Sequence, residues 1–218
     1  GIYRSSELTF TPTLRMNGAS SEYAGTTTPD NNTRLTISNF GIVITDAPKG
    51  KRYERRKWKT VSFAFGMNRV ADFNRNYTYQ GKNTTSSATQ VFEADANQFP
   101  NEVNSSAPSS VPGYVGYQSY LIDPYQSSSI TFTSVVPFSG GINQIRTVQE
   151  KGSINEYVIS VGGNYQERLM LGATIGIPSV NYDHQSSYRE ELTNDNHAAN
   201  PAGFSSFNYN QSLNISGE

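Results

Sequence analysis

The stretch from Val61 to Asn68, Val-Ser-Phe-Ala-Phe-Gly-Met-Asn, alternates large apolar residues with small uncharged ones. Because successive side chains of a β-strand point to opposite faces, this pattern predicts a strand with two very different faces. One face holds Val61, Phe63, Phe65 and Met67, and the other holds Ser62, Ala64, Gly66 and Asn68. Strands that face bulk solvent usually carry charges, whereas the water-filled lumen of a barrel accepts small neutral residues. The stretch therefore favours a β-protein whose second face is mild and polar.

Five further segments show similar alternation, at 8–16, 33–45, 157–165, 169–177 and 207–215. In the first, Pro12 lacks a backbone donor, which predicts an edge strand or a local irregularity. In the second, the apolar phase changes between Ile37 and Phe40, which predicts a β-bulge near Ser38 and Asn39. Long polar loops are expected near 17–32, 74–152 and 183–203. Since 74–152 is too long for an unstructured loop, local elements are expected within it, including a short strand at 129–135.

The best-defined hairpin joins the segments 157–165 and 169–177. Its apolar face holds Tyr157, Ile159, Val161, Leu169, Leu171, Ile175 and Ile177. Its opposite face holds Ser160, Gly162, Asn164, Gly172, Thr174 and Gly176. If the apolar face meets lipid, the second set lines an interior and contacts water, a plug or a ligand.

The connections between predicted strands alternate between long and short. In an up-and-down meander the long loops then emerge at one end and the short turns at the other, as they do in outer-membrane barrels. A soluble β-sandwich can show the same alternation with its apolar face turned inward, because periodicity does not say which face is wet. Periodicity alone does not distinguish these two architectures. The alternation of long and short loops and the small, uncharged residues of the second face favour the barrel.

Composition narrows the function classes. The chain has 218 residues, long enough for one all-β domain, and 16% of them are charged, below the roughly 25% typical of soluble domains. A net charge of −1 gives no reason to expect nucleic acid as a partner. With no Cys, disulfides and thiolate metal sites are excluded. No catalytic motif occurs at a diagnostic spacing, so we expect no enzyme and no cofactor.

Two polar clusters have ordinary explanations. His184 and His197 share a predicted loop and resemble a weak metal or porphyrin site, but solvated side chains explain them as well, and no metal is expected. The segment from Lys49 to Lys59 holds seven of the seventeen Lys and Arg residues. It suits the phosphates of lipid or nucleic acid, although a solvated turn is the simpler interpretation.

Several segments together resemble the FadL/TodX family of outer-membrane transport proteins, in particular the branch labelled haemin receptor. They are the N-terminal run from Gly1 to Leu14, the strand from Trp58 to Arg75, the segment from Tyr120 to Pro124, and the hairpin from Gly152 to Pro178. The resemblance implies a fourteen-stranded barrel, plugged by an N-terminal hatch, that moves hydrophobic molecules such as long-chain fatty acids across the bacterial outer membrane.

The resemblance also sets expectations for what lies outside these residues. About six of fourteen strands are present, so residues 1–218 are expected to form a partial barrel completed by a missing remainder and hatch, or by another chain. An inward kink in the family's third strand opens the wall laterally, and the matching strand here places Gly66, Asn68 and Arg69 as the kink region. The alternative for Arg69 is that it marks the end of the membrane-embedded stretch.

The sequence thus predicts an all-β, antiparallel up-and-down transmembrane β-barrel in the outer membrane. Its expected partners are membrane lipid and a hydrophobic small molecule, carried by passive, hatch-gated diffusion. Two other functions are kept as alternatives: a barrel of the same fold that acts as a scaffold or carrier in protein secretion, and a soluble β-sandwich binding module.

Overall fold

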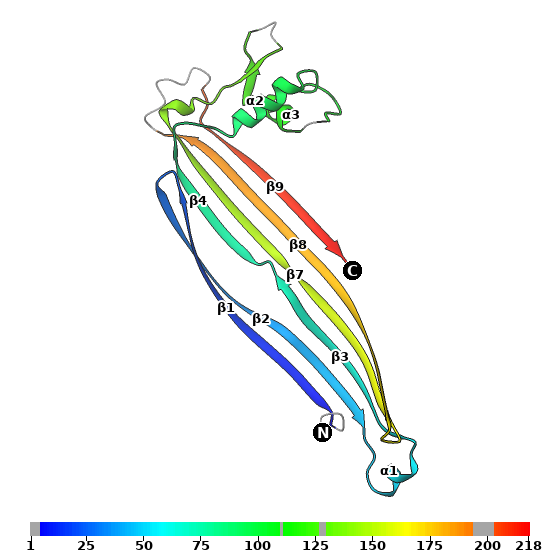
Figure 1. Cartoon of the computed structure of the whole chain (residues 1–218). Helices are drawn as coiled ribbons and strands as arrows, with labels where there is room; N and C mark the ends of the chain where they lie inside the picture. The colour runs from blue at the N-terminus through cyan, green and yellow to red at the C-terminus, as the bar shows by residue number, and fades with distance from the viewer. Residues whose placement is uncertain (1–4, 110, 127–129, 194–202) are drawn as a thin grey trace.

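The computed structural model describes residues 5–109, 111–126, 130–193 and 203–218, and one large antiparallel sheet dominates it (Figure 1). The strands of this sheet are β1 (Glu7–Tyr23), β2 (Thr26–Asp46), β3 (Trp58–Asp72), β4 (Arg75–Asn83), β7 (Ile142–Tyr165), β8 (Leu169–Leu192) and β9 (Ser206–Gly217). They follow the order β1-β2-β3-β7-β8-β9, and β4 also pairs with β7. The predicted all-β, antiparallel meander is confirmed. Among the described residues no ladder joins β1 to β9, so the sheet is open.

The hairpin of β7 and β8 is the longest part of the sheet. Its ladder runs without a register shift from Tyr165↔Leu169 to Ile142↔Leu192, which confirms the predicted hairpin and extends it well beyond the predicted ends. In the turn, Gln166 and Glu167 both have positive φ. The Asn164 side chain stabilises that turn by accepting a hydrogen bond from the backbone N–H of Glu167 at 2.9 Å.

The prediction of a loop at 17–32 is wrong. There β1 and β2 continue as a hairpin that is paired from Asn17↔Asn32 to Tyr23↔Thr26. The turn is made by Ala24 and Gly25, which both have positive φ, as a tight two-residue hairpin turn requires. Polar residues occupy both faces of this hairpin, so it lacks the apolar period that reveals a strand.

The loop predicted at 74–152 is wrong at its two ends, although the local elements expected within it are present, and the loop predicted at 183–203 is wrong over 183–192. The first contains all of β4 and the beginning of β7, and the second contains the end of β8. Between β4 and β7 lies an insert, residues 84–141, which forms α2 (Thr89–Gln98), α3 (Val111–Gln118), β5 (Ile122–Pro124), β6 (Phe132–Ser134) and the 3₁₀ helix η2 (Phe138–Gly140). The short strand expected at 129–135 corresponds to β6; Ser129 is outside the described residues.

The irregularities predicted in the first two strands are confirmed. Thr11 pairs with Asn39 and Pro12 with Ile37, so Ser38 is the extra residue of a bulge. β1 is also an edge strand, where the missing N–H of Pro12 is tolerated. The bulge restores the phase of β2, so its apolar residues on both sides of Ser38 lie on one face.

One face of the sheet carries a band of exposed apolar side chains, here called the belt. One row of the ladder crosses five strands through Leu8, Ile42, Phe65, Ile159 and Ile175, and these residues are 37 to 70% exposed. The belt comprises Leu8, Phe10, Phe40, Ile42, Ile44, Val61, Phe63, Phe65, Met67, Tyr157, Ile159, Val161, Leu169, Leu171, Ala173, Ile175 and Ile177. We call the opposite side of the sheet the polar face.

The buried apolar core lies under the insert rather than against the belt. Phe92 and Ala96 of α2, with Ile122 and Phe132, pack against the ends of β7, β8 and β9. Below this core Glu190 is completely buried. Its carboxylate accepts hydrogen bonds from Ser87 Oγ (2.5 Å), Ala88 N (2.7 Å), Gln144 Nε2 (2.8 Å) and Tyr188 Oη (2.5 Å). These bonds fasten the start of α2 to the sheet.

The connections fall at two ends of the sheet, as Figure 1 shows. The turn at 24–25, the insert, the end of β8 and the start of β9 lie at one end. The connection that contains α1 (Lys51–Arg55) and the β7–β8 turn lie at the other. Within the described part of the chain, no helix is long and apolar enough to cross a membrane.

Candidate functional site

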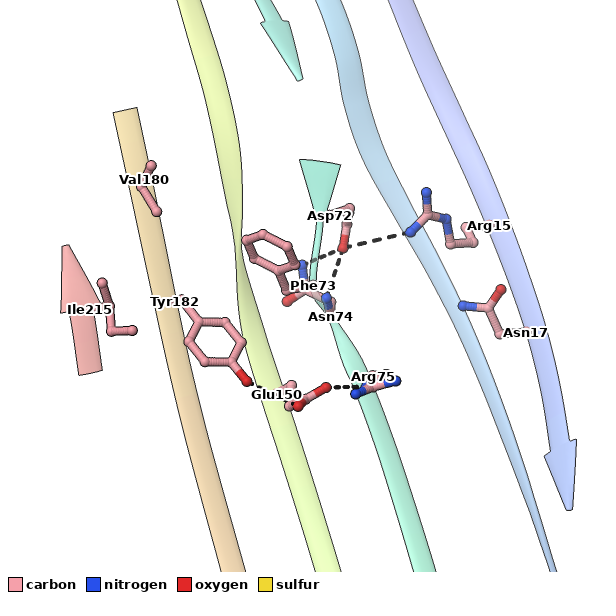
Figure 2. A pocket seen from close by; sticks show the side chains of 10 residues that line it. All are labelled: Arg15, Asn17, Asp72, Phe73, Asn74, Arg75, Glu150, Val180, Tyr182 and Ile215. Atoms are coloured by element: carbon pink, nitrogen blue, oxygen red, sulfur yellow. Dashed lines mark hydrogen bonds and ion pairs between the residues drawn. The ribbon is translucent and has the colours of Figure 1, made fainter. Parts of the chain in front are cut away.

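The candidate site lies where one long strand is broken. β3 ends at Asp72 and β4 begins at Arg75, yet both pair with β7, so they are two halves of one strand interrupted at Phe73 and Asn74. Figure 2 shows the residues around the break. The sequence predicted a kink of this strand at Gly66, Asn68 and Arg69. The structure instead interrupts the strand farther along, at Phe73 and Asn74.

The Asn74 side chain takes the place of a backbone peptide at the break. Its Nδ2 donates to the carbonyl oxygen of Gly152 at 3.0 Å, and its Oδ1 accepts from the Gly152 N–H at 3.3 Å. Asp72 Oδ1 in turn accepts from the backbone N–H of Asn74 at 2.9 Å and from Nδ2 at 2.7 Å. Gly152 has a φ of +135°, and a Cβ there would lie 2.1 Å from the carbonyl oxygen of Asn181, so only glycine fits.

A seam separates β2 from the broken strand. The β2–β3 ladder ends at Asn39↔Asn68, whose side-chain amides are hydrogen-bonded to each other. Farther along, the hairpin tip touches the polar face instead: the Tyr23 ring lies 5.5 Å from the Tyr79 ring, and Tyr23 Oη donates to Gln144. Between these two contacts no ladder joins β2 to β3 or β4 in the described ranges.

A hollow of about 630 Å³ lies beside the break. Its lining is Arg15, Asn17, Asp72, Phe73, Asn74, Arg75, Glu150, Val180, Tyr182 and Ile215 (Figure 2). Phe73 and Tyr182 meet edge to face with ring centroids 5.5 Å apart, and Val180 and Ile215 continue this apolar wall. The remaining wall holds two Asn and four charged side chains, so the hollow suits a molecule with an apolar body and a polar end.

The charged wall consists of two groups, both beyond the belt. Arg75 Nε and Tyr182 Oη donate to the Glu150 carboxylate, the latter at 3.0 Å, and His184 Nδ1 lies 3.3 Å from it. The hydrogen bond from Arg75 outweighs burial and lowers the pKa of Glu150. This explains His184 as a structural residue of β8; His197 is outside the described residues.

The second charged group surrounds Asp72 at the seam. Arg15 Nη1 lies 3.9 Å from one carboxylate oxygen of Asp72, and Arg69 Nη1 lies 3.6 Å from the other. Burial raises the pKa of Asp72, but the hydrogen bonds from Asn74 and the nearby guanidinium charges outweigh it and lower that pKa overall. Arg15 is thereby drawn across the seam from β1 toward the broken strand.

The register separates the residues predicted for the two faces. All eleven residues predicted to face lipid lie in the belt. Ten predicted lumen residues share the polar face, where Ser62 pairs with Gly162, Ala64 with Ser160 and Gly162 with Gly172. The other members of this set are Gly66, Asn68, Asn164, Thr174 and Gly176. Ser160 and Thr174 hydroxyls are 3.0 Å apart.

Arg69 is the exception. It lies two residues beyond Met67 in an uninterrupted part of the ladder, where it pairs with Asn155, so it shares the face of the belt rather than the polar face. The physical reason is that the phase changes only after Arg69, at the register shift between Arg69 and Ala71. Its guanidinium hydrogen-bonds Asn155 and reaches Asp72 instead of an interior.

None of the predicted lumen residues lines the hollow. The residues that do line it were missed because they come from β1, β3, β4, β7, β8 and β9 and from the break between β3 and β4. One signal was available: Gly152 interrupts an otherwise regular strand pattern, and Asp72-Phe-Asn74 has the side chains that form local hydrogen-bonded turns. Among the described residues no group of His, Asp or Glu is arranged to hold a metal ion.

Comparisons with known proteins add no relative. No protein-family model, no curated protein and no solved structure matches the chain.

Proposed function

We propose that this chain forms part of the wall of a bacterial outer-membrane β-barrel through which a hydrophobic small molecule passes by diffusion. The belt carries this proposal. Isolated soluble proteins rarely expose contiguous apolar patches above a few hundred Å², whereas the belt crosses five strands. On β8 its extent, from Leu169 to Ile177, matches the roughly 9–11 residues with which a tilted strand crosses a bilayer.

The polar face supports the same proposal. Opposite the belt, β3, β7 and β8 carry small neutral residues in register, which is the composition of a water-filled lumen. The soluble β-sandwich needs a second sheet over the apolar face. Apart from the main sheet, the described residues form only the two-stranded sheet of β5 and β6, within the insert.

In this proposal the hollow beside the break is a binding site on the path of the transported molecule. An apolar body rests on Phe73, Tyr182 and Ile215, and a polar end meets the guanidinium groups of Arg15 and Arg75. The seam beside it lacks a ladder, so a molecule there meets no continuous hydrogen-bonded wall. No catalysis or cofactor is involved.

Uptake by cells tests the proposal. Cells expressing the gene that encodes this chain should take up a radiolabelled long-chain fatty acid faster than cells carrying an empty vector. Ile215→Trp fills the hollow and should reduce the rate severalfold, whereas Ile175→Trp, a matched change in the belt, should leave it unchanged. Equal uptake with and without the protein sinks the transport proposal and favours the scaffold or carrier alternative.

A further inference from the structure

The outer side of the sheet has a second hollow, of about 420 Å³, at the end of the belt nearest α1. Trp58, Val61, Val161 and Leu171 wall it, and Gly163 and Ala173 form its floor. The hollow exists because Gly163 has no side chain: a Cβ there would lie 2.6 Å from the Trp58 ring. This groove is lined by apolar side chains and glycines, so it suits a hydrocarbon chain.

Trp58 is held in place as one wall of the groove. Its ring meets that of Tyr165 edge to face, with centroids 5.4 Å apart, and 43% of the residue remains exposed. Trp and Tyr are the residues that gather where an apolar band meets lipid headgroups. The groove therefore opens at the boundary between the belt and the polar end of the sheet.

A dense group of cations lies directly beyond that boundary. The segment 46–59 contains seven Lys and Arg residues and two carboxylates. Two of the cations have local partners: Arg56 pairs with Asp46 at 2.6 Å, and Lys59 Nζ donates to the carbonyl oxygen of Tyr53 at 2.8 Å. The other five are exposed and form no ion pair among the described residues: Lys49, Lys51, Arg52, Arg55 and Lys57.

The cationic segment is tied to the groove rather than merely near it in sequence. Lys59 Nζ also lies 4.8 Å above the Tyr53 ring, which joins α1 to the beginning of β3. Tyr53 Oη donates to Glu167 in the β7–β8 turn, which joins α1 to the strands that floor the groove. The free cations thus belong to the segment that leads into Trp58 at the groove, while Val61, Val161 and Leu171 of the groove belong to the belt.

We propose that this groove and segment 49–57 form a binding site for an anionic glycerophospholipid. An acyl chain lies along the groove, and the phosphate of the headgroup contacts the cations of α1. The charge complementarity selects an anionic headgroup over a zwitterionic one, since each cation near a headgroup layer contributes attraction only to net negative lipid. This inference rests on the proposed membrane location of the belt.

The only Trp of the chain, Trp58, reports on the site directly. The full chain is placed in phosphatidylcholine vesicles that contain a fixed fraction of either brominated phosphatidylglycerol or brominated phosphatidylcholine. Bromine quenches Trp fluorescence on contact. We expect local enrichment of the phosphatidylglycerol of about fivefold or more, the factor that corresponds to roughly one favourable cation–lipid interaction.

Two triple variants of equal charge change separate the site from a general attraction. Lys51→Gln/Arg52→Gln/Arg55→Gln should abolish the preference for phosphatidylglycerol. Lys82→Gln/Lys151→Gln/Arg189→Gln, away from α1, should retain it. Loss of the preference in both variants would overturn the proposal, because the effect would then follow net charge alone.

The remaining outcomes separate this inference from the proposed function. Equal quenching by both brominated lipids overturns the lipid site while the membrane location of the belt stands. Absence of quenching by either lipid overturns both. Soluble glycerol phosphate should not compete with the lipid; if it abolishes the preference at a concentration equal to that of the lipid, the segment binds phosphate alone and the acyl groove plays no part.

Discussion

Replacing Asn74 by Ala tests the explanation of the broken strand. Asn74 is buried, and its side chain makes three of the hydrogen bonds that hold the break together, two to Gly152 and one to Asp72. The Gly152 carbonyl keeps a second donor, the Phe73 N–H at 3.0 Å. The substitution therefore leaves the Gly152 N–H without its acceptor and Asp72 without one of its donors.

The expected cost follows from these lost contacts. A typical intramolecular hydrogen bond contributes about 0.5–1.5 kcal/mol, and a buried donor left without a partner costs about 1–3 kcal/mol. Because water can enter from the adjacent hollow, we expect the lower part of this range, about 2 kcal/mol for local opening at the break. That corresponds to roughly a thirtyfold larger equilibrium constant for local opening.

Native-state amide hydrogen exchange measures this opening residue by residue. Exchange at Gly152 and Phe73 should accelerate by about tenfold to a hundredfold in Asn74→Ala, while the amides of the β7–β8 hairpin near Ile159 remain protected. Asn76→Ala is the matched control, because Asn76 is exposed and adjacent on β4. If Asn74→Ala and Asn76→Ala exchange alike at Gly152, the side chain does not replace the backbone and the explanation is refuted.

Two further predictions concern buried carboxylates. Because the hydrogen bond from Arg75 holds the pKa of Glu150 below its ordinary value of 4.5, the stabilisation of the β4–β7 pair is complete above about that pH and is lost as the pH falls through the lowered value. The protection of the β4 amides, measured relative to the intrinsic exchange rate at each pH, should thus fall on acidification in the wild type. An identical acid profile in Glu150→Gln would contradict this. In Glu190→Gln one acceptor oxygen becomes an NH₂ donor that faces the four donors around Glu190. This should weaken the attachment of α2 by about 1–3 kcal/mol and speed proteolytic cleavage of the insert. Glu191→Gln changes an exposed neighbour and is the control; equal cleavage rates in the two variants would count against the role of Glu190.

The alternation of apolar and small polar residues was sufficient to predict much of the sheet. The period of two places Phe63 and Phe65 on one face whichever strand lies beside them. A change of phase such as that at Ser38 requires one extra residue, which is a β-bulge. The β7–β8 hairpin and the antiparallel order followed from the same local rule. These features depend on neighbours in the sequence, so the sequence alone determined them.

Strands with polar residues on both faces escaped this rule. The hairpin around Ala24 and the strand β4 have no apolar stripe, and they are strands because a partner strand accepts and donates their backbone hydrogen bonds. The period places Arg69 on the face of the belt, as observed; its prediction as a lumen residue came from the expected kink, and only the register shows that the phase changes after Arg69. Pairing over long distances in the chain decided all three.

The two hollows were decided by tertiary structure alone. The one at the broken strand exists because Asn74 reaches Gly152, 78 residues away in the chain, and because Arg15 comes across a seam from another strand. The outer groove exists because Trp58 lies over Gly163. A period in the sequence says which face a side chain occupies; which side chains share a hollow depends on register and on where pairing stops, and these are set by contacts between distant segments.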